Sequence, residues 1–115
     1  MQKREMGNLG ESIVCDYLKA KAWKILERNF YSKYGEIDII AQDPTHTLVF
    51  CEVKTYKPDS LVSPIEAITH KKLEKIRKTA LYYLSQTKQE DTPARIDALI
   101  VQEGMVVDHL KNISC

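Results

Sequence analysis

A turn between two short apolar segments limits most strongly what this 115-residue chain can fold into. Residues 36–41 and 47–54 are rich in branched apolar side chains that favour strands, and residues 43–46, Asp-Pro-Thr-His, have the composition of a turn. The pattern predicts an antiparallel hairpin centred near residue 45. Asp38 on the first strand then lies opposite Glu52 on the second, with Cβ atoms about 5 Å apart.

The rest of the chain adds two helices and three strands. Apolar residues recur at helical spacing from Asn8 to about Lys21, and Asn8 with Glu11 resembles a capping box that starts this helix. Ser63-Pro64-Ile65-Glu66 predicts the start of a second helix that runs to about Ser85, with a bend near residues 69–71. The other strands are predicted at residues 23–30, 94–101 and 105–110, and a loop at 57–60. This order predicts an α/β fold, a mixed β-sheet of about five strands flanked by two main helices, in a single domain of residues 1–115.

Composition excludes several classes of protein. No apolar run approaches the ~18 residues that cross a bilayer, and no apolar stretch follows the charged start, so we expect a soluble, cytoplasmic protein without a membrane partner. The three cysteines and three histidines are scattered, which argues against a zinc site or a disulfide framework. Cys15, Cys51 and Trp23 are expected to pack in the core, and Arg95 and Asp97 share a strand face that favours an ion pair.

Charge is unevenly distributed although the net charge is only +1. Residues 29–53 carry −3 and residues 54–88 carry +5. Such blocks are compatible with a carboxylate site beside a phosphate-binding surface, and the alternative is chance clustering on solvated faces.

The hairpin gathers groups with the chemistry of a metal site. Two carboxylates facing each other repel strongly, and a divalent cation between Asp38 and Glu52 would relieve that repulsion. Mg²⁺ prefers such oxygen ligands, and the backbone carbonyl of Val53 could add another. Lys54 shares the strand face of Glu52, and Glu11 lies at the border of the apolar stripe of the first helix. The pattern favours metal-assisted phosphodiester hydrolysis; the alternative is an ordinary strand end with solvent-exposed carboxylates paired to Lys54.

The second helix carries a row of lysines. Lys71, Lys75 and Lys78 share one face, and Lys71 or Lys72 is placed to reach the carboxylates. One interpretation is a ridge that follows the phosphates of a nucleic acid, and the other is a solvated helix face.

Two motifs resemble a known nuclease family. Gly35-Glu36-Ile37-Asp38 and Glu52-Val53-Lys54 resemble the PD-(D/E)xK motif. The whole chain resembles the YraN family of uncharacterised bacterial proteins, which is similar to archaeal Holliday-junction resolvases. Further matching segments are Gly7-Asn8-Leu9-Gly10-Glu11, Arg28-Asn29, Lys71 or Lys72, and Arg95-Ile96-Asp97.

The resemblance implies a restriction-endonuclease-like fold with Glu11, Asp38, Glu52 and Lys54 at the active site. It further implies Mg²⁺ or Mn²⁺ as cofactor and DNA, including branched DNA, as substrate. Because resolvases of this fold usually work as dimers, the resemblance also leads us to expect a homodimer. The chain departs from the family at Tyr31 and Tyr56, where arginines are usual, although Tyr56 can still stack on a base. Two alternatives to a nuclease stay open: a non-catalytic nucleic-acid-binding module, and a protein-interaction domain with a vestigial site.

Overall fold

A computed structural model describes residues 3–57, 61, 63 and 65–113 of the chain. Residues 3–8 are described by their backbone alone. Pro64, Cys115 and residues 58–60 of the predicted loop lie outside the described residues. None of the helices in the described ranges is long and apolar enough to cross a membrane.

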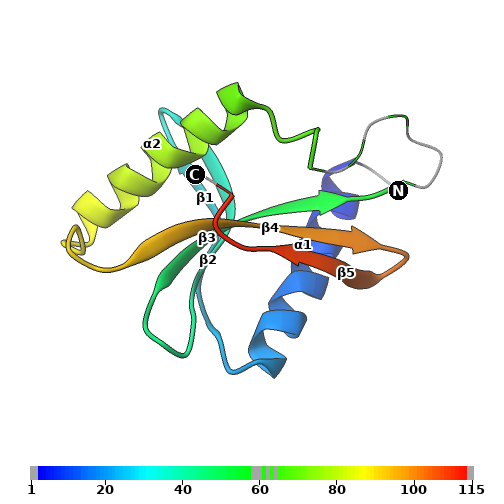
Figure 1. The fold of residues 1–115 in the computed structure, drawn as a ribbon, viewed down its shortest axis with the longest axis horizontal. Coiled ribbons are helices and arrows are strands. Elements are labelled where there is room, and N and C mark those ends of the chain that lie inside the picture. The colour runs from blue at the N-terminus through cyan, green and yellow to red at the C-terminus, as the bar shows by residue number, and fades with distance from the viewer. Residues whose placement is uncertain (1–2, 58–60, 62, 64, 114–115) are drawn as a thin grey trace.

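Two helices and five strands follow one another in the predicted order (Figure 1). They are α1 (Lys3–Ala20), β1 (Lys24–Ser32), β2 (Gly35–Gln42), β3 (Leu48–Thr55), α2 (His70–Gln86), β4 (Ala94–Gln102) and β5 (Met105–Leu110). The α/β class, the mixed five-stranded sheet and the two main helices are therefore confirmed. The capping box predicted at Asn8 and Glu11 is wrong, because α1 begins at Lys3 and Asn8 lies inside the helix.

The strands lie in the sheet in chain order, from β1 at one edge to β5 at the other. Only β3 and β4 are parallel, and α2 forms the crossover that a parallel pair requires. The β2–β3 hairpin has the predicted register, with Ile40 opposite Phe50 and Ile39 opposite Cys51. Its turn is held by the Asp43 side chain, which accepts hydrogen bonds from the backbone N–H groups of Thr45 and Thr47.

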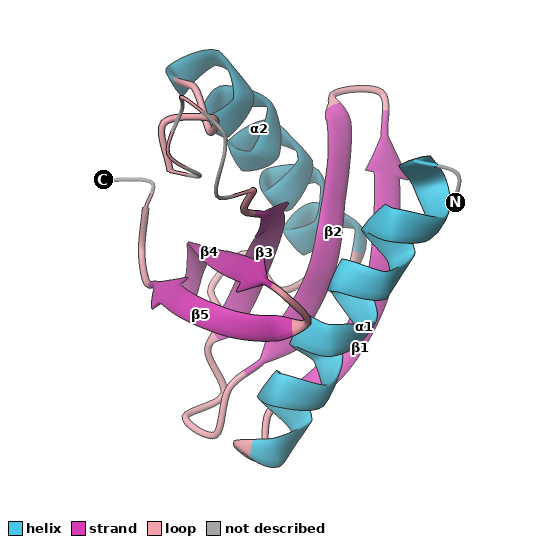
Figure 2. Ribbon diagram, turned by 90° about the vertical axis from the view of Figure 1, so that its right-hand side faces the viewer, coloured by secondary structure: helices cyan, strands magenta, loops and turns pink. Residues whose placement is uncertain are grey.

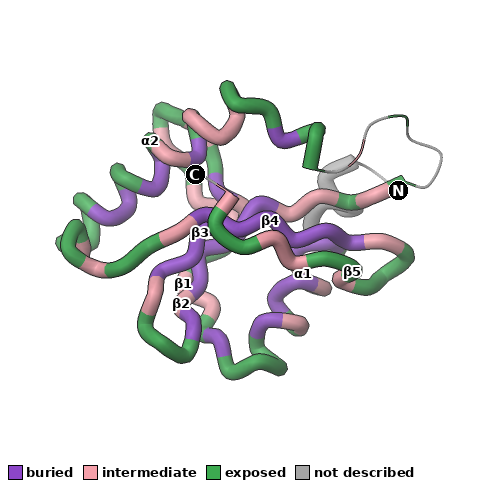
Figure 3. The backbone as a smooth tube through the Cα atoms, viewed as in Figure 1, coloured by how far each residue is buried: buried purple, intermediate pink, exposed green. Residues whose placement is uncertain are grey.

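The helices cover opposite faces of the sheet (Figure 2). Between α1 and the sheet lies the α1 core, which contains Val14, Cys15, Leu18, Trp23, Ile39, Cys51 and Leu99. Between α2 and the sheet lies the α2 core, which contains Ile37, Ile40, Phe50, Ile76, Tyr83 and Ile96. Central strands are thus buried on both faces (Figure 3), and the expected packing of Cys15, Cys51 and Trp23 is confirmed.

The second helix begins later than its capping signal predicts. Ser63 and Glu66 do exchange the reciprocal hydrogen bonds of a capping box, with N···O distances of 3.3 and 3.4 Å. The box starts only a short turn, because α2 begins at His70 with Thr69 as its N-cap. The predicted break near residues 69–71 is therefore the start of the helix.

A buried charge network joins the last two strands. Asp97 is fully buried and accepts hydrogen bonds from Arg95 Nε at 2.9 Å and from the backbone N–H of Asn112 at 2.9 Å. His109 Nε2 lies 2.8 Å from the same carboxylate, and Arg95 also reaches Asp43 at 3.3 Å. The predicted Arg95–Asp97 pair is confirmed, and through it the network ties β5 and the β2–β3 turn to β4.

Candidate active site

Strands β1 and β2 change faces together beside the candidate site. Residues two apart on a strand normally share a face. On β2, however, Ile39 packs in the α1 core and Ile37 in the α2 core. On β1, Arg28 bonds to Ser12 of α1 at 3.1 Å, whereas Phe30 packs against the α2 core.

Asn29 lies at the point where β1 switches. Its φ of 53° is in the left-handed region, which asparagine tolerates better than most residues. In the β1–β2 register Arg28 is paired with Ile39, and the next pair is Phe30 with Ile37. Asp38 occupies the matching position on β2, so the switch in both strands determines where its carboxyl group points.

Asp38 turns toward β3 at the end of the hairpin ladder. The last β2–β3 pair is Ile39 with Cys51, so the predicted direct pairing of Asp38 with Glu52 is replaced by another contact. Asp38 Oδ2 instead accepts a hydrogen bond from the backbone N–H of Val53 at 2.8 Å. Burial and the negative charge of Glu52 raise the pKa of the Asp38 carboxyl to about 7. The expected electrostatic conflict between the two carboxylates is therefore present.

Glu52 is buried between two lysines. Its Oε1 atom lies 2.9 Å from Lys72 Nζ of α2 and 3.5 Å from Lys54 Nζ on its own strand. Burial and the neighbouring Lys72 lower the pKa of the Lys54 ammonium. Of the two lysines predicted to reach the carboxylates, Lys72 is the one that does.

Glu11 approaches the same region from α1. The helix lies close to β3 at Gly10, where an added Cβ would stand 3.4 Å from Thr55 Oγ1. Glu11 is 7% exposed, and its Oε1 atom has no hydrogen-bond partner within the part of the chain that the structure describes. Arg28 Nη2 lies 3.9 Å from this atom. Burial raises the pKa of Glu11, against the opposing effects of Asn29 and Arg28.

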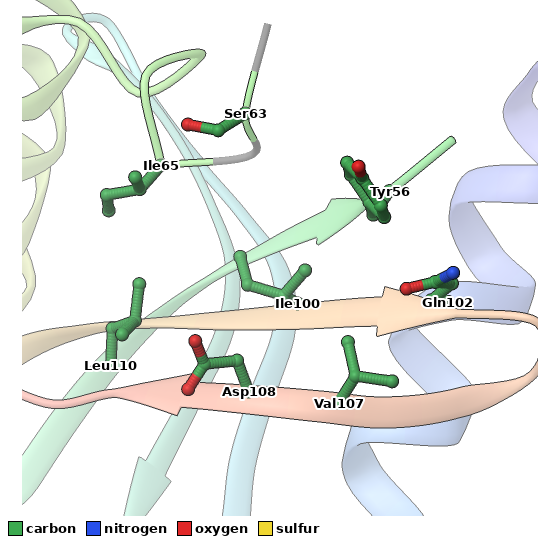
Figure 4. Close-up of a pocket in the computed structure, with 8 residues that line it drawn as sticks. All are labelled: Tyr56, Ser63, Ile65, Ile100, Gln102, Val107, Asp108 and Leu110. Atoms are coloured by element: carbon green, nitrogen blue, oxygen red, sulfur yellow. The ribbon is translucent and has the colours of Figure 1, made fainter. Parts of the chain in front are cut away.

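Other predicted residues lie farther from these carboxylates. Lys71, Lys75 and Lys78 are exposed along α2. Tyr56 extends β3 by one residue, since its N–H donates to Val101 O at 2.7 Å, and its side chain lines a pocket on β4 and β5 (Figure 4). The roles of Arg28 and Asn29 were not assigned from the sequence, where the tolerance of asparagine for a left-handed backbone was the available signal.

The donor set suits a hard divalent cation. Among the described residues, no three His, Cys, Asp or Glu side chains form a ready-made metal-binding group. Mg²⁺ often needs only one or two carboxylates and completes its shell with water and phosphate oxygens. Asp38 and Glu52 provide two carboxylates in mutual repulsion, and Glu11 provides a buried oxygen that makes no hydrogen bond to the described residues. We conclude that these residues fit such an ion.

The Asp38→Asn substitution is expected to stabilise the metal-free protein at neutral and alkaline pH. In the unfolded chain Asp38 ionises near its usual pKa of 3.8, whereas in the folded chain its pKa is about 7. Between these two pKa values the folded state therefore binds more protons than the unfolded state. The free energy of unfolding of the wild type falls as the pH rises through this range, and the loss is complete at pH values above it. Asparagine can still accept the Val53 N–H bond, and the variant should gain on the order of 3 kcal/mol over wild type at pH 8.

Urea denaturation with EDTA, at pH 4.5 and at pH 8, measures this gain. Asp16→Asn is the matched control, because it is the same substitution at an exposed residue of α1. A gain from Asp38→Asn of equal size at both pH values would show that ionisation of Asp38 does not destabilise the fold.

Comparison with known proteins places this chain in one family. Uncharacterised protein family UPF0102 matches residues 10–101. A UPF0102 protein of Thermodesulfovibrio yellowstonii is 39% identical over 97% of both chains. A UPF0102 protein of Geotalea daltonii is 44% identical over 96% of this chain and 87% of its own length. A UPF0102 protein of Thermotoga maritima is 43% identical over 90% of this chain and 91% of its own length. The chain therefore belongs to the UPF0102 family, the YraN family that its sequence motifs resemble.

Proposed function

We propose that this protein is a metal-dependent nuclease that hydrolyses phosphodiester bonds in DNA. The observation that carries the proposal is that the buried Glu52, beside two lysines, lies near enough to Asp38 to help raise the pKa of the Asp38 carboxyl to about 7. A structural ion pair does not need a second carboxylate placed where it raises the pKa of the first. Groups with strongly shifted pKa values are concentrated at functional sites.

Each residue of the cluster has a distinct role in this proposal. Asp38 and Glu52 would hold Mg²⁺ or Mn²⁺, with Glu11 and the Val53 carbonyl as further oxygen ligands. The bound ion would supply Lewis acidity, which lowers the pKa of a bound water and offsets negative charge on the phosphate. Lys54, with its lowered pKa, would orient the attacking water or donate to the scissile phosphate. Lys72 would hold the Glu52 carboxylate in place.

The exposed face of α2 supports DNA as the substrate. Lys71, Lys75 and Lys78 follow one another along the helix at i, i+4 and i+7, and all three are exposed. Lys72, from the same helix, reaches the candidate site, so the lysine row begins next to the carboxylates. A phosphate chain lying along this row would pass over the cluster. The resemblance to Holliday-junction resolvases supports branched DNA in particular, cut by a homodimer that matches its two-fold symmetry.

Cleavage of labelled DNA tests the proposal. Four-way junction, flap, single-stranded and linear duplex substrates are incubated with the protein in Mg²⁺, in Mn²⁺ and in EDTA. Wild type should cut at least one substrate only when metal is present, and Asp38→Asn prepared in the same way should not. Equal cutting by both proteins would identify a contaminating nuclease, and no cutting by either would oppose catalysis by this chain.

A non-catalytic nucleic-acid-binding module is the second candidate. The observation that favours it is the close contact of Lys72 and Lys54 with Glu52, because these cations already neutralise that carboxylate without a metal. Such a module would bind DNA in a salt-sensitive way, unchanged by Mg²⁺ and by Asp38→Asn. Metal-dependent cleavage by wild type alone excludes it.

A further inference from the structure

We propose that a pocket beside the candidate site receives one unpaired base of the DNA substrate; this inference rests on the nuclease function proposed above. The pocket lies on the same face of the sheet as α2 and has a volume of about 350 Å³ (Figure 4). Its apolar floor comes from Ile100, Val107 and Leu110, with Ile65 beside it. Its polar groups come from Tyr56, Ser63, Gln102 and Asp108. The volume is at the lower end of the range of about 300–1,000 Å³ typical of small-ligand pockets, which suits a single base.

Strand β3 connects the pocket to the candidate site. The side chains of Glu52, Lys54 and Tyr56 lie on one face of the strand, because they are two residues apart. The hydrogen bond from the Tyr56 N–H to the Val101 carbonyl continues the β3–β4 ladder past Thr55. Lys54 is paired with Ile100 in the β3–β4 register, so the pocket floor begins directly beside it. Residues two apart on a strand are about 7 Å apart. A nucleotide with its phosphate at Lys54 can therefore place its own base at Tyr56.

The lining favours a base over a phosphate. No lysine or arginine is found among the described residues that line the pocket, and the Asp108 carboxylate would repel a phosphate group. The Tyr56 ring and the aliphatic floor offer surfaces on which a flat aromatic base can stack. The pocket thus complements the uncharged part of a nucleotide, whereas the lysines of α2 complement its charged part.

The polar groups favour a base with hydrogen-bond donors on its Watson–Crick edge. Asp108 as a carboxylate only accepts hydrogen bonds, and Gln102 both donates and accepts. Guanine presents an N–H and an amino group side by side on that edge, which one carboxylate can accept together, and a carbonyl oxygen that an amide can contact. Thymine lacks the amino group. This edge is free only in an unpaired nucleotide, so the pocket would select DNA with an unpaired guanine beside the cut.

Binding without metal tests the pocket separately from catalysis. The full chain is titrated in EDTA with a labelled duplex that carries one unpaired guanine, with the same duplex carrying an unpaired thymine, and with the fully paired duplex. Wild type should bind the guanine bulge about tenfold more tightly than the paired duplex. Tyr56→Ala should remove most of this preference, Tyr56→Phe should keep it, and Asp108→Asn should bind the two bulges alike.

Tyr31→Ala is the matched control, because Tyr31 is 64% exposed and belongs to β1, at the other edge of the sheet. It should leave the preference for the bulge unchanged. Equal binding of bulged and paired duplexes by wild type would overturn the pocket, even if metal-dependent cleavage is observed. A bulge preference that Tyr56→Ala leaves intact would overturn it as well, and so would a preference for guanine over thymine that Asp108→Asn leaves intact. Absence of cleavage in the presence of a Tyr56-dependent bulge preference would instead refute the nuclease function alone.

Discussion

Replacing Glu52 by glutamine is expected to lower the rate of the proposed metal-dependent DNA cleavage by about a thousandfold. Glutamine has nearly the same size and can still contact Lys72, so the fold should persist. It lacks the negative charge that Glu52 would contribute to a bound cation, and it leaves Lys54 and Lys72 without the anion that now lies 3.5 and 2.9 Å from them. The loss should therefore appear in the chemical step and in metal affinity together.

Glu74→Gln is the matched control for this substitution. Glu74 is also a glutamate in contact with a cation, Arg77 at 2.8 Å on α2, but its side chain is 43% exposed. Single-turnover cleavage, titrated with Mn²⁺ at fixed DNA concentration, measures both variants against wild type. Cleavage by Glu52→Gln at the wild-type rate would mean that the catalytic cluster has been assigned to the wrong residues.

Replacing Asp97 by alanine should lower the free energy of unfolding by about 3–5 kcal/mol. The carboxylate is fully buried, and its loss leaves Arg95, His109 and the Asn112 N–H without their acceptor. A loss of this size is a large fraction of the stability of an ordinary domain. The C-terminal strand β5 should be affected most, because Asp97 contacts His109 of β5 and accepts from the Asn112 N–H that follows the strand.

Urea denaturation of Asp97→Ala and Asp97→Asn measures this effect. Asp16→Ala is the control, since Asp16 is exposed on α1 and its loss should change stability by less than about 0.5 kcal/mol. Asparagine keeps one acceptor oxygen and should recover part of the loss. A small effect of Asp97→Ala would show that water readily replaces the buried carboxylate.

The features that sequence predicts well are those that depend on neighbouring residues. The turn at Asp43 and the alternation on both sides of it predict the β2–β3 register, which is confirmed. The same alternation places Lys54 beside Glu52. The sequence predicts that Lys71 or Lys72 reaches that carboxylate, and the structure shows that Lys72 does.

The features that sequence misses depend on contacts across the fold. The left-handed backbone at Asn29 and the change of face at Asp38 require β1 and β2 to pack jointly against α1 and α2. The capping signal at Ser63 is real, but α2 starts after Thr69, whose side chain accepts from the Lys72 N–H, and the helix packs over Phe50 and Ile96. His109 acquires a partner only when β5 folds back onto β4.

The left-handed residue in β1 also has a consequence for the solubility of the folded chain. β1 is an edge strand, and edge strands expose backbone groups onto which a strand from another molecule can add. Asn29 places a left-handed residue in the middle of this edge, and a register shift between Ile25 and Glu27 adds a second irregularity. A straight incoming strand could match only short parts of such an edge. The irregularity that turns Asp38 toward β3 thereby also protects the sheet against growth by edge-to-edge aggregation.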